Sequence, residues 1–195
     1  NINIFIRFFD EVEFPETRTF YDIPFNLEDG PSMVHYFKEV SYDLLTVNTT
    51  HFPTTSTNEN ISYQDQYTRG YYQPYNEVAN PIGYQNDNQS RTREHELLKN
   101  AVEAVQHQIQ EDLDVDANND GYVDNVTFLV RGSPGAWASL LWPHRWALYT
   151  EEAYINGSRV YDYNLNLEQG GYFTVGTLCH EFSHSLGAPD LYHYW

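Results

Sequence analysis

The chain is poor in sulfur and in positive charge. It has one cysteine, Cys179, and one methionine, Met33. A single cysteine excludes an intramolecular disulfide, so the redox compartment cannot be inferred from bridges. Lys and Arg number 10 against 28 Asp and Glu, a formal net charge of -18, and so acidic a surface repels phosphate backbones. No apolar run approaches the ~18 residues of a membrane helix. We therefore expect neither a nucleic-acid partner nor a membrane span.

The 195 residues fit one domain with a substantial core. Hydrophobic patterning predicts a core strand in "INIFIRFF", an amphipathic helix around "PSMVHYFKEVSYDLL", a helix from about Arg91 to Asp112, a strand in "NVTFLVRG", a hairpin in "AYINGSRVY" and a final helix from about Val175. In the first helix we expect Met33, Tyr36 or Phe37, Val40 and Leu44 on the core side. The stretch from Val47 to Ser90 has little periodicity, and we expect it to cross the surface without regular structure. Alternating strands and helices indicate an α/β or α+β fold.

The stretch "HEFSHSLGAPD", from His180 to Asp190, carries the strongest chemical signal. On a helix His184 lies about 40° from His180 and Glu181 about 100° from it, so the three share one arc. Leu178, Phe182 and Leu186 fall on the opposite, core-facing side, and Cys179 is expected to be a buried thiol there. Imidazoles at i and i+4 can both bind one zinc ion, and Glu181 is placed to act as general base on a water.

Past the helix, Gly187 permits a left-handed exit and Pro189 prevents the helix from resuming. The chain can then double back and bring Asp190 to the metal. His180, His184 and Asp190 would make three protein ligands and leave the fourth position of a catalytic zinc site open. The alternative is a polar helix surface followed by a turn.

These residues resemble a known family. HExxHxxG is the metzincin signature, and "HEFSHSLGAPDLY" resembles the active-site segment of the immune inhibitor A family of secreted zinc metallopeptidases. The resemblance extends to "FIRFFDEVEF", "YFKEVSYDLL", "NNDGYVDNVTFLVRG" and "LWPHRW". It implies zinc binding by His180, His184 and Asp190, with Glu181 as the base. His193 stands where relatives often have an aspartate, which makes it a rival third ligand.

The same resemblance implies a zincin or metzincin-like catalytic domain over residues 1–195, with a twisted mixed sheet over the active-site helix. Metzincins need a methionine-containing turn after the third ligand, and the only methionine here lies far upstream. We therefore expect the chain to form the upper lobe only and to have low activity by itself. A downstream lobe or further domains in the full-length protein would then be its partner, and protein or peptide its substrate.

A second ion site is predicted in "DVDANNDGYVD". Asp116, Asn118 and Asp120 alternate before Gly121, as in the first half of a calcium loop, and Tyr122 (through its carbonyl), Asp124 and Asp114 complete the candidate ligands. The glutamate of an EF-hand is missing, since Thr127 occupies its position. Relatives in the family carry a similar segment. The alternative is a solvated turn, because Asp, Asn and Gly all favour turns.

His144, in "WPHRW", is a candidate for the border of the cleft, although a histidine between tryptophans is more often structural. Taken together, the sequence predicts a secreted zinc endopeptidase stabilised by calcium. The competing hypothesis is a non-catalytic binding module, stabilised by calcium or zinc, that derives from such a peptidase. Glu181 argues against the module, because a metal-binding scaffold needs no base at that position.

Overall fold

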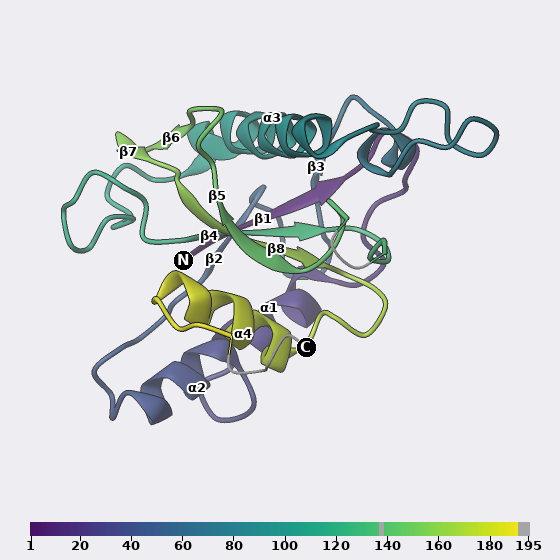
Figure 1. The fold of residues 1–195 in the computed structure, drawn as a ribbon. Coiled ribbons are helices and arrows are strands. Elements are labelled where there is room, and N and C mark those ends of the chain that lie inside the picture. Colours follow the sequence, from purple (N-terminus) through teal and green to yellow (C-terminus); the bar gives the residue numbers. More distant parts are fainter. Residues whose placement is uncertain (137–138, 191–195) are drawn as a thin grey trace.

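The computed structural model describes residues 1–136 and 139–190, which form three layers with a sheet between helices (Figure 1). The α-helices in these ranges are α1 (Arg18–Asn26), α2 (Met33–Val40), α3 (Asp87–Val105) and α4 (Val175–Ser185), and two 3₁₀ turns are η1 (Arg69–Tyr72) and η2 (Gln106–Gln108). The strands are β1 (Ile2–Arg7), β2 (Thr50–Phe52), β3 (Tyr63–Gln64), β4 (Val126–Val130), β5 (His144–Ala147), β6 (Tyr154–Ile155), β7 (Ser158–Arg159) and β8 (Asp162–Leu167).

Six strands form a mixed, mostly parallel sheet, in which five follow the order β2-β1-β4-β8-β5 and β3 pairs with β1. Strands β2 and β3 pair with successive halves of β1, and every pair is parallel except β5 with β8. Strand β5 therefore closes one edge of the sheet as its antiparallel member. The chain is a mixed α/β protein, as the alternation of predicted strands and helices indicates.

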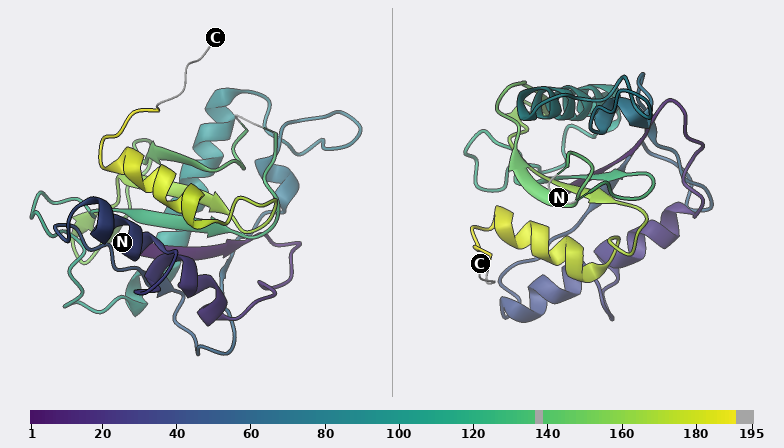
Figure 2. Two further views of the ribbon diagram at one scale, coloured as in Figure 1. Left: turned by 90° about the horizontal axis from the view of Figure 1, so that it is seen from below. Right: turned by 45° about the vertical axis from the view of Figure 1, so that its right-hand side comes forward.

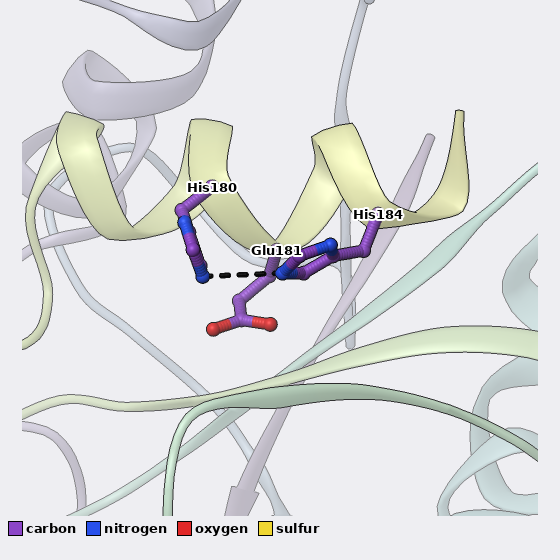
Figure 3. A group of neighbouring side chains, drawn as sticks. All are labelled: His180, Glu181 and His184. Carbon is purple, nitrogen blue, oxygen red and sulfur yellow. Dashed lines mark hydrogen bonds between the residues drawn. The ribbon is translucent and has the colours of Figure 1, made fainter. Parts of the chain in front are cut away.

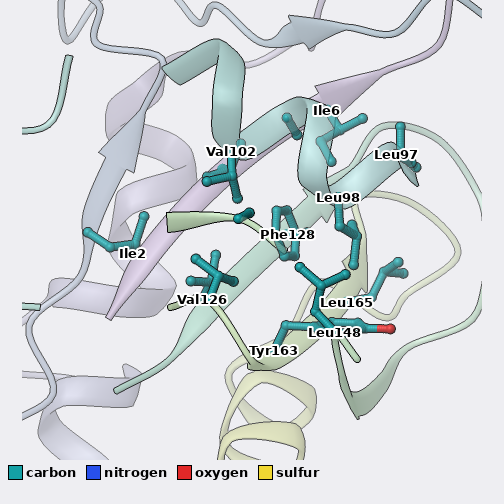
Figure 4. Packing of buried hydrophobic residues seen from close by; sticks show 14 of the residues in the cluster. Ile2, Ile6, Leu97, Leu98, Val102, Val126, Phe128, Leu148, Tyr163 and Leu165 are labelled. Atoms are coloured by element: carbon teal, nitrogen blue, oxygen red, sulfur yellow. The ribbon is translucent and has the colours of Figure 1, made fainter. Parts of the chain in front are cut away.

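Helix α3 covers one face of the sheet and buries the main core (Figure 4). Because side chains alternate along a strand, Ile4 of β1, Phe128 of β4 and Leu165 of β8 all point to this face. They meet Leu98 and Val102 of α3, which have no exposed surface. Complete burial of one such side chain contributes roughly 1.5–3 kcal/mol, so this face holds the sheet and α3 together.

The opposite face of the sheet carries α1, α2 and α4 (Figure 2). Its central side chains are partly polar: Asn3 of β1, Thr127 of β4 and Asn164 of β8 are all buried. Buried polar groups need hydrogen-bond partners, and Asn164 finds its partner on α4. Polar pairing as well as apolar contact therefore sets the position of α4.

Helix α1 has no counterpart among the predicted elements, and its nine residues include Pro24. The helix forms because the Thr17 hydroxyl accepts a bond from Phe20 N, and because Tyr21 and Phe25 bury one side of it. Helix α2 is shorter than expected. Val40 and Leu44, placed on the core side by sequence, are 52% and 90% exposed. The prediction of core positions was wrong there because the helix stops at Val40 and the following turn directs the chain outward.

The excursion from Val47 to Ser90 contains β2, β3 and η1, so the expectation of no regular structure was wrong. Buried polar contacts also hold this segment against the rest of the protein. Arg18 donates from Nε to Asn60 Oδ1 (2.7 Å) and from Nη2 to the carbonyl of Ile61 (3.0 Å). Tyr72 donates to Asp65 over 2.7 Å. The two bonds of Arg18 join residues 42 and 43 positions apart in the sequence, which periodicity does not reveal.

Three other predicted elements agree with the structure. The strand in "NVTFLVRG" is β4, and the hairpin is β6–β7 with positive φ at Asn156 (50°) and Gly157 (89°), as a type I′ turn requires. The final helix begins at Val175 as expected. The helix predicted from Arg91 to Asp112 begins earlier and ends at Val105. In the described residues, no helix has the length and apolar character needed to span a membrane.

Candidate metal centre

Helix α4 presents the site because its other side is buried. Its first turn is capped by Thr174, whose hydroxyl accepts from Thr177 N at 3.1 Å. Leu178, Cys179 and Phe182 then pack in a cluster with Phe25 of α1, Met33 and Phe37 of α2, and Val47. Burial raises the pKa of the Cys179 thiol to about 12, so it is a neutral core group. Leu186 was assigned to the same apolar side, but it is 54% exposed, because the helix has already ended at Ser185.

His180, Glu181 and His184 project from α4 toward one region near β5 (Figure 3). Each brings one potential ligand atom within 4.8 Å of the others. The Nε2 atoms of the two imidazoles are 3.1 Å apart. The spacing of i and i+4 therefore gives the convergence that the sequence predicts.

The exit from the helix fixes the tautomer of His184. Gly187 adopts a φ of 91°, and the chain turns back so that the carbonyl of Ala188 lies 2.7 Å from His184 Nδ1. A carbonyl can only accept, so Nδ1 carries the proton and the lone pair of Nε2 faces the site. Outer groups hold the rings of metal-binding histidines in proteins by contacts of this kind.

Asp190 brings a third potential ligand atom close to the two imidazoles. Its Oδ1 lies 3.3 Å from His184 Nε2 and 3.7 Å from His180 Nε2. A triangle with these two sides and the 3.1 Å separation of the imidazole nitrogens has a centre about 2 Å from each corner, close to the ~2.0–2.2 Å of zinc bonds to nitrogen and carboxylate oxygen. Both the distances and the donor types fit zinc. The rival ligand, His193, lies outside the described residues.

Glu181 is buried, although it shares the arc of the two histidines. Burial raises the pKa of its carboxyl group, against the opposing effect of His180, His144 and His184. The backbone of Glu181 is held by Asn164 of β8, whose Nδ2 donates to its carbonyl at 3.0 Å. The carboxylate borders a cavity of about 500 Å³ together with both histidines, Asp190 and residues of β5. A raised pKa in a cavity is typical of a proton-transferring group.

His144 of β5 also borders this cavity. Its Nε2 lies 2.9 Å from Glu94 Oε1 and its Nδ1 lies 2.6 Å from the carbonyl of Trp142. Both partners are acceptors when Glu94 is ionised, so both ring nitrogens carry protons and the imidazole is a cation. Burial opposes this charge, but the attraction and hydrogen bond of Glu94 and the bond to the Trp142 carbonyl raise the pKa of His144 to about 9.

Glu94 is the group that sequence reasoning missed. It lies on α3, on the far side of β5, and also accepts a hydrogen bond from the Tyr163 hydroxyl. Burial favours its neutral form, but the charge of His144 and its two hydrogen bonds lower the pKa of the carboxyl group overall. In the sequence Glu94 is one of many acidic residues on a polar helix, and no spacing marks it as the partner of His144.

The predicted calcium loop connects η2 to β4 and is held by its own side chains. Asp116 accepts from Asp120 N (3.0 Å) and Gly121 N (2.9 Å), and Asp120 accepts from Tyr122 N (2.9 Å). Ala117 N donates to Asp124 over 3.4 Å. Asp114 accepts from the backbone N of Asp116. In the described part of the chain, the loop carboxylates do not form a cluster of three as tight as that on α4. The calcium site stays a prediction.

Comparison of the chain with protein-family models and with curated proteins finds no match. The site geometry and the sequence motifs therefore provide the support for a function.

Zinc binding should depend on Asp190 and not on His193. We expect Asp190→Ala to lower zinc affinity by more than the ~10–100-fold typical of outer-shell groups, because it removes one of three converging atoms. Competition against a zinc-chelating dye measures this affinity. His193→Ala is the matched variant and should bind zinc as the unsubstituted chain does. Loss of zinc binding in His193→Ala alone would make His193, and not Asp190, the third ligand.

The His144–Glu94 pair should make stability depend on pH. The pKa of His144 is about 9 in the folded chain and 6.5 in an ordinary environment, so the pair stabilises the fold fully below pH 6.5 and less as pH rises through 9. Urea unfolding of metal-free protein at pH 6 and at pH 10 measures this. The difference in unfolding free energy between the wild type and His144→Gln should shrink by about 2 kcal/mol from pH 6 to pH 10. This is less than the full pKa shift corresponds to, because the imidazole is partly exposed to solvent.

The exposed His107→Gln is the control for this measurement. Its difference from the wild type should be equal at the two pH values. A His144→Gln difference that does not change with pH would show that the imidazole is not held as a cation.

Calcium should stabilise the chain by binding the loop. An ion that binds only the folded state raises the unfolding midpoint, and here it would also offset repulsion among Asp116, Asp120 and Asp124. Thermal unfolding with and without calcium tests this. The midpoint should rise by several degrees in the wild type, and Asp120→Ala should lose that rise. Equal midpoints with and without calcium in both proteins would make the segment a plain turn.

Proposed function

We propose that the chain is a zinc-dependent endopeptidase. The observation that carries the proposal is the convergence of His180 Nε2, His184 Nε2 and Asp190 Oδ1, with the buried Glu181 carboxylate beside them in one cavity. Two imidazoles and one carboxylate are a common ligand set of catalytic zinc, which keeps a fourth position open. Zinc held by such residues acidifies water and polarises a peptide carbonyl.

The resemblance to the immune inhibitor A family supports the same proposal. In that family's zincin fold a twisted mixed sheet lies over the helix that carries HExxH. Here α4 packs along β8 and β5 of a mixed sheet, which is compatible with that arrangement. The family relationship and the extracellular location that it implies are parts of the proposal.

Glu181 is the general base in this reaction. Its carboxylate accepts a proton from the attacking water and then gives it to the leaving amine of the cleaved bond. Burial raises the pKa of this carboxyl group, which makes the carboxylate a stronger base toward the attacking water. His144 contributes a fixed positive charge to the cavity wall, and positive charge favours the negative charge that develops on the carbonyl oxygen.

The free edge of β5 is suited to hold an extended peptide across the site. Leu148 N donates to the carbonyl of Tyr161 at 2.7 Å, and bonded pairs alternate along antiparallel strands. His144 and Trp146 therefore bond toward β8, whereas the backbone groups of Arg145 and Ala147 face away from the sheet. In the described part of the chain no strand pairs with this edge. An added peptide strand would satisfy these groups.

Hydrolysis should require Glu181 while zinc binding should not. We expect Glu181→Gln to lower kcat on a labelled unfolded protein by about 10²–10⁴-fold, with zinc content by mass spectrometry unchanged. The exposed Glu103→Gln is the control and should cleave like the wild type. Bound zinc without hydrolysis in the wild type would favour the non-catalytic binding module. Full activity in Glu181→Gln would remove Glu181 from the reaction.

A further inference from the structure

A second cavity, of about 420 Å³, lies on the α3 side of β5. It is bordered by Arg91 and Glu94 of α3 and by Trp142, His144 and Trp146. The last three residues also border the cavity of the metal centre. The two cavities therefore meet at the edge strand, one on each face of the sheet.

A peptide paired with β5 would reach both cavities. Arg145 forms an ion pair with Asp162, which in turn contacts Ser185 of α4, so its side chain lies on the α4 face. His144 contacts Glu94 of α3 and so lies on the other face. Side chains of an added strand alternate in the same way. Those beside Arg145 would face the metal cavity, and those beside His144 or Trp146 would face the second cavity.

The charged groups of the second cavity offset one another. Glu94 and His144 form a pair at 2.9 Å, and Asp87 and Arg91 lie four residues apart on α3, where opposite charges are neighbours. Burial lowers the pKa of His95, which favours the neutral imidazole. This arrangement leaves no net charge that would select an acidic or a basic side chain.

The tryptophans select an aromatic occupant instead. Trp146 is 52% exposed, so much of its side chain is accessible to a ligand. Trp142 is packed edge-on against Tyr172, with ring centroids 4.9 Å apart. An aromatic side chain buries roughly 150–250 Å² and gains further from ring pairing. Arg91 adds a cation that is favourable over a ring face.

We propose that the second cavity is a specificity subsite that takes an aromatic side chain of the substrate, one residue along the chain from a side chain that faces the metal cavity. This inference rests on the proposed function, because it assumes that a peptide binds along β5. Trp146 is the specificity-determining residue, and the His144–Glu94 pair forms the floor of the subsite.

The test uses two measurements on one set of peptides. Each peptide is a soluble, otherwise alanine-based sequence with a single Phe, and the position of Phe is moved along the set. Affinity is measured calorimetrically with zinc-loaded Glu181→Gln, and kcat/KM is measured with the wild type. At a preferred position we expect Phe to exceed Ala by at least about tenfold in both, the range of side-chain discrimination by an apolar pocket.

Variants assign this preference to the cavity. Trp146→Ala should reduce the Phe preference to less than about threefold, and Trp146→Phe should restore most of it. Phe9→Ala is the matched control, since Phe9 is an exposed aromatic residue of neither cavity. A preference that persists in Trp146→Ala, or equal values for Phe and Ala at every position, overturns the subsite.

The two proposals fail differently. Phe-dependent binding that needs Trp146, without hydrolysis by the wild type, supports the subsite and overturns the peptidase. Hydrolysis without any aromatic preference overturns the subsite and supports the peptidase. Absence of both binding and hydrolysis overturns both.

Discussion

Helix α4 is fixed from two directions, and the positions of His180, Glu181 and His184 in the candidate site depend on this constraint. Its apolar side is buried against Phe25, Met33 and Phe37 of α1 and α2, which prevents rotation about its axis. Asn164 of β8 bonds to the Glu181 carbonyl, which sets the helix against the sheet. Because the rotation of α4 and its position on the sheet are fixed, the imidazoles of His180 and His184 face the edge strand β5. Precision of this kind is what a metal site requires of its supporting residues.

Charge is distributed unevenly in the protein. The chain has a formal net charge of -18, yet the wall of the candidate site carries a histidine cation, because Glu94 and the Trp142 carbonyl hold both protons of His144. Glu94 belongs to α3 and contacts His144 at the edge of the sheet. A residue on one face of the sheet therefore holds the charge of a group that borders the site on the other face. A surface rich in carboxylates repels anions at a distance, whereas a fixed cation acts at the point where negative charge would develop.

Prediction from sequence succeeded where a segment's own pattern decides its structure. The strand β4, the Asn156–Gly157 hairpin and the start of α4 are examples. It failed where distant contacts decide. Helix α1 forms despite Pro24 because Tyr21 and Phe25 are buried by other elements. The strand β8 reads "DYNLNL", and its Asn164 is stable in a central strand because α4 supplies the Glu181 carbonyl as a partner.

The sequence by itself determined the local geometry of the site. The i and i+4 spacing puts His180 and His184 on one side of any helix, and Gly187 permits the left-handed turn that leads back to Asp190, because these relations follow from backbone geometry alone. Only the tertiary structure decided that β5 lies at the edge, that Glu94 charges His144, and that two cavities share Trp142 and Trp146. These features join residues of α3, β5 and α4 that are distant in sequence, and packing of the whole sheet, not any local propensity, brings them together.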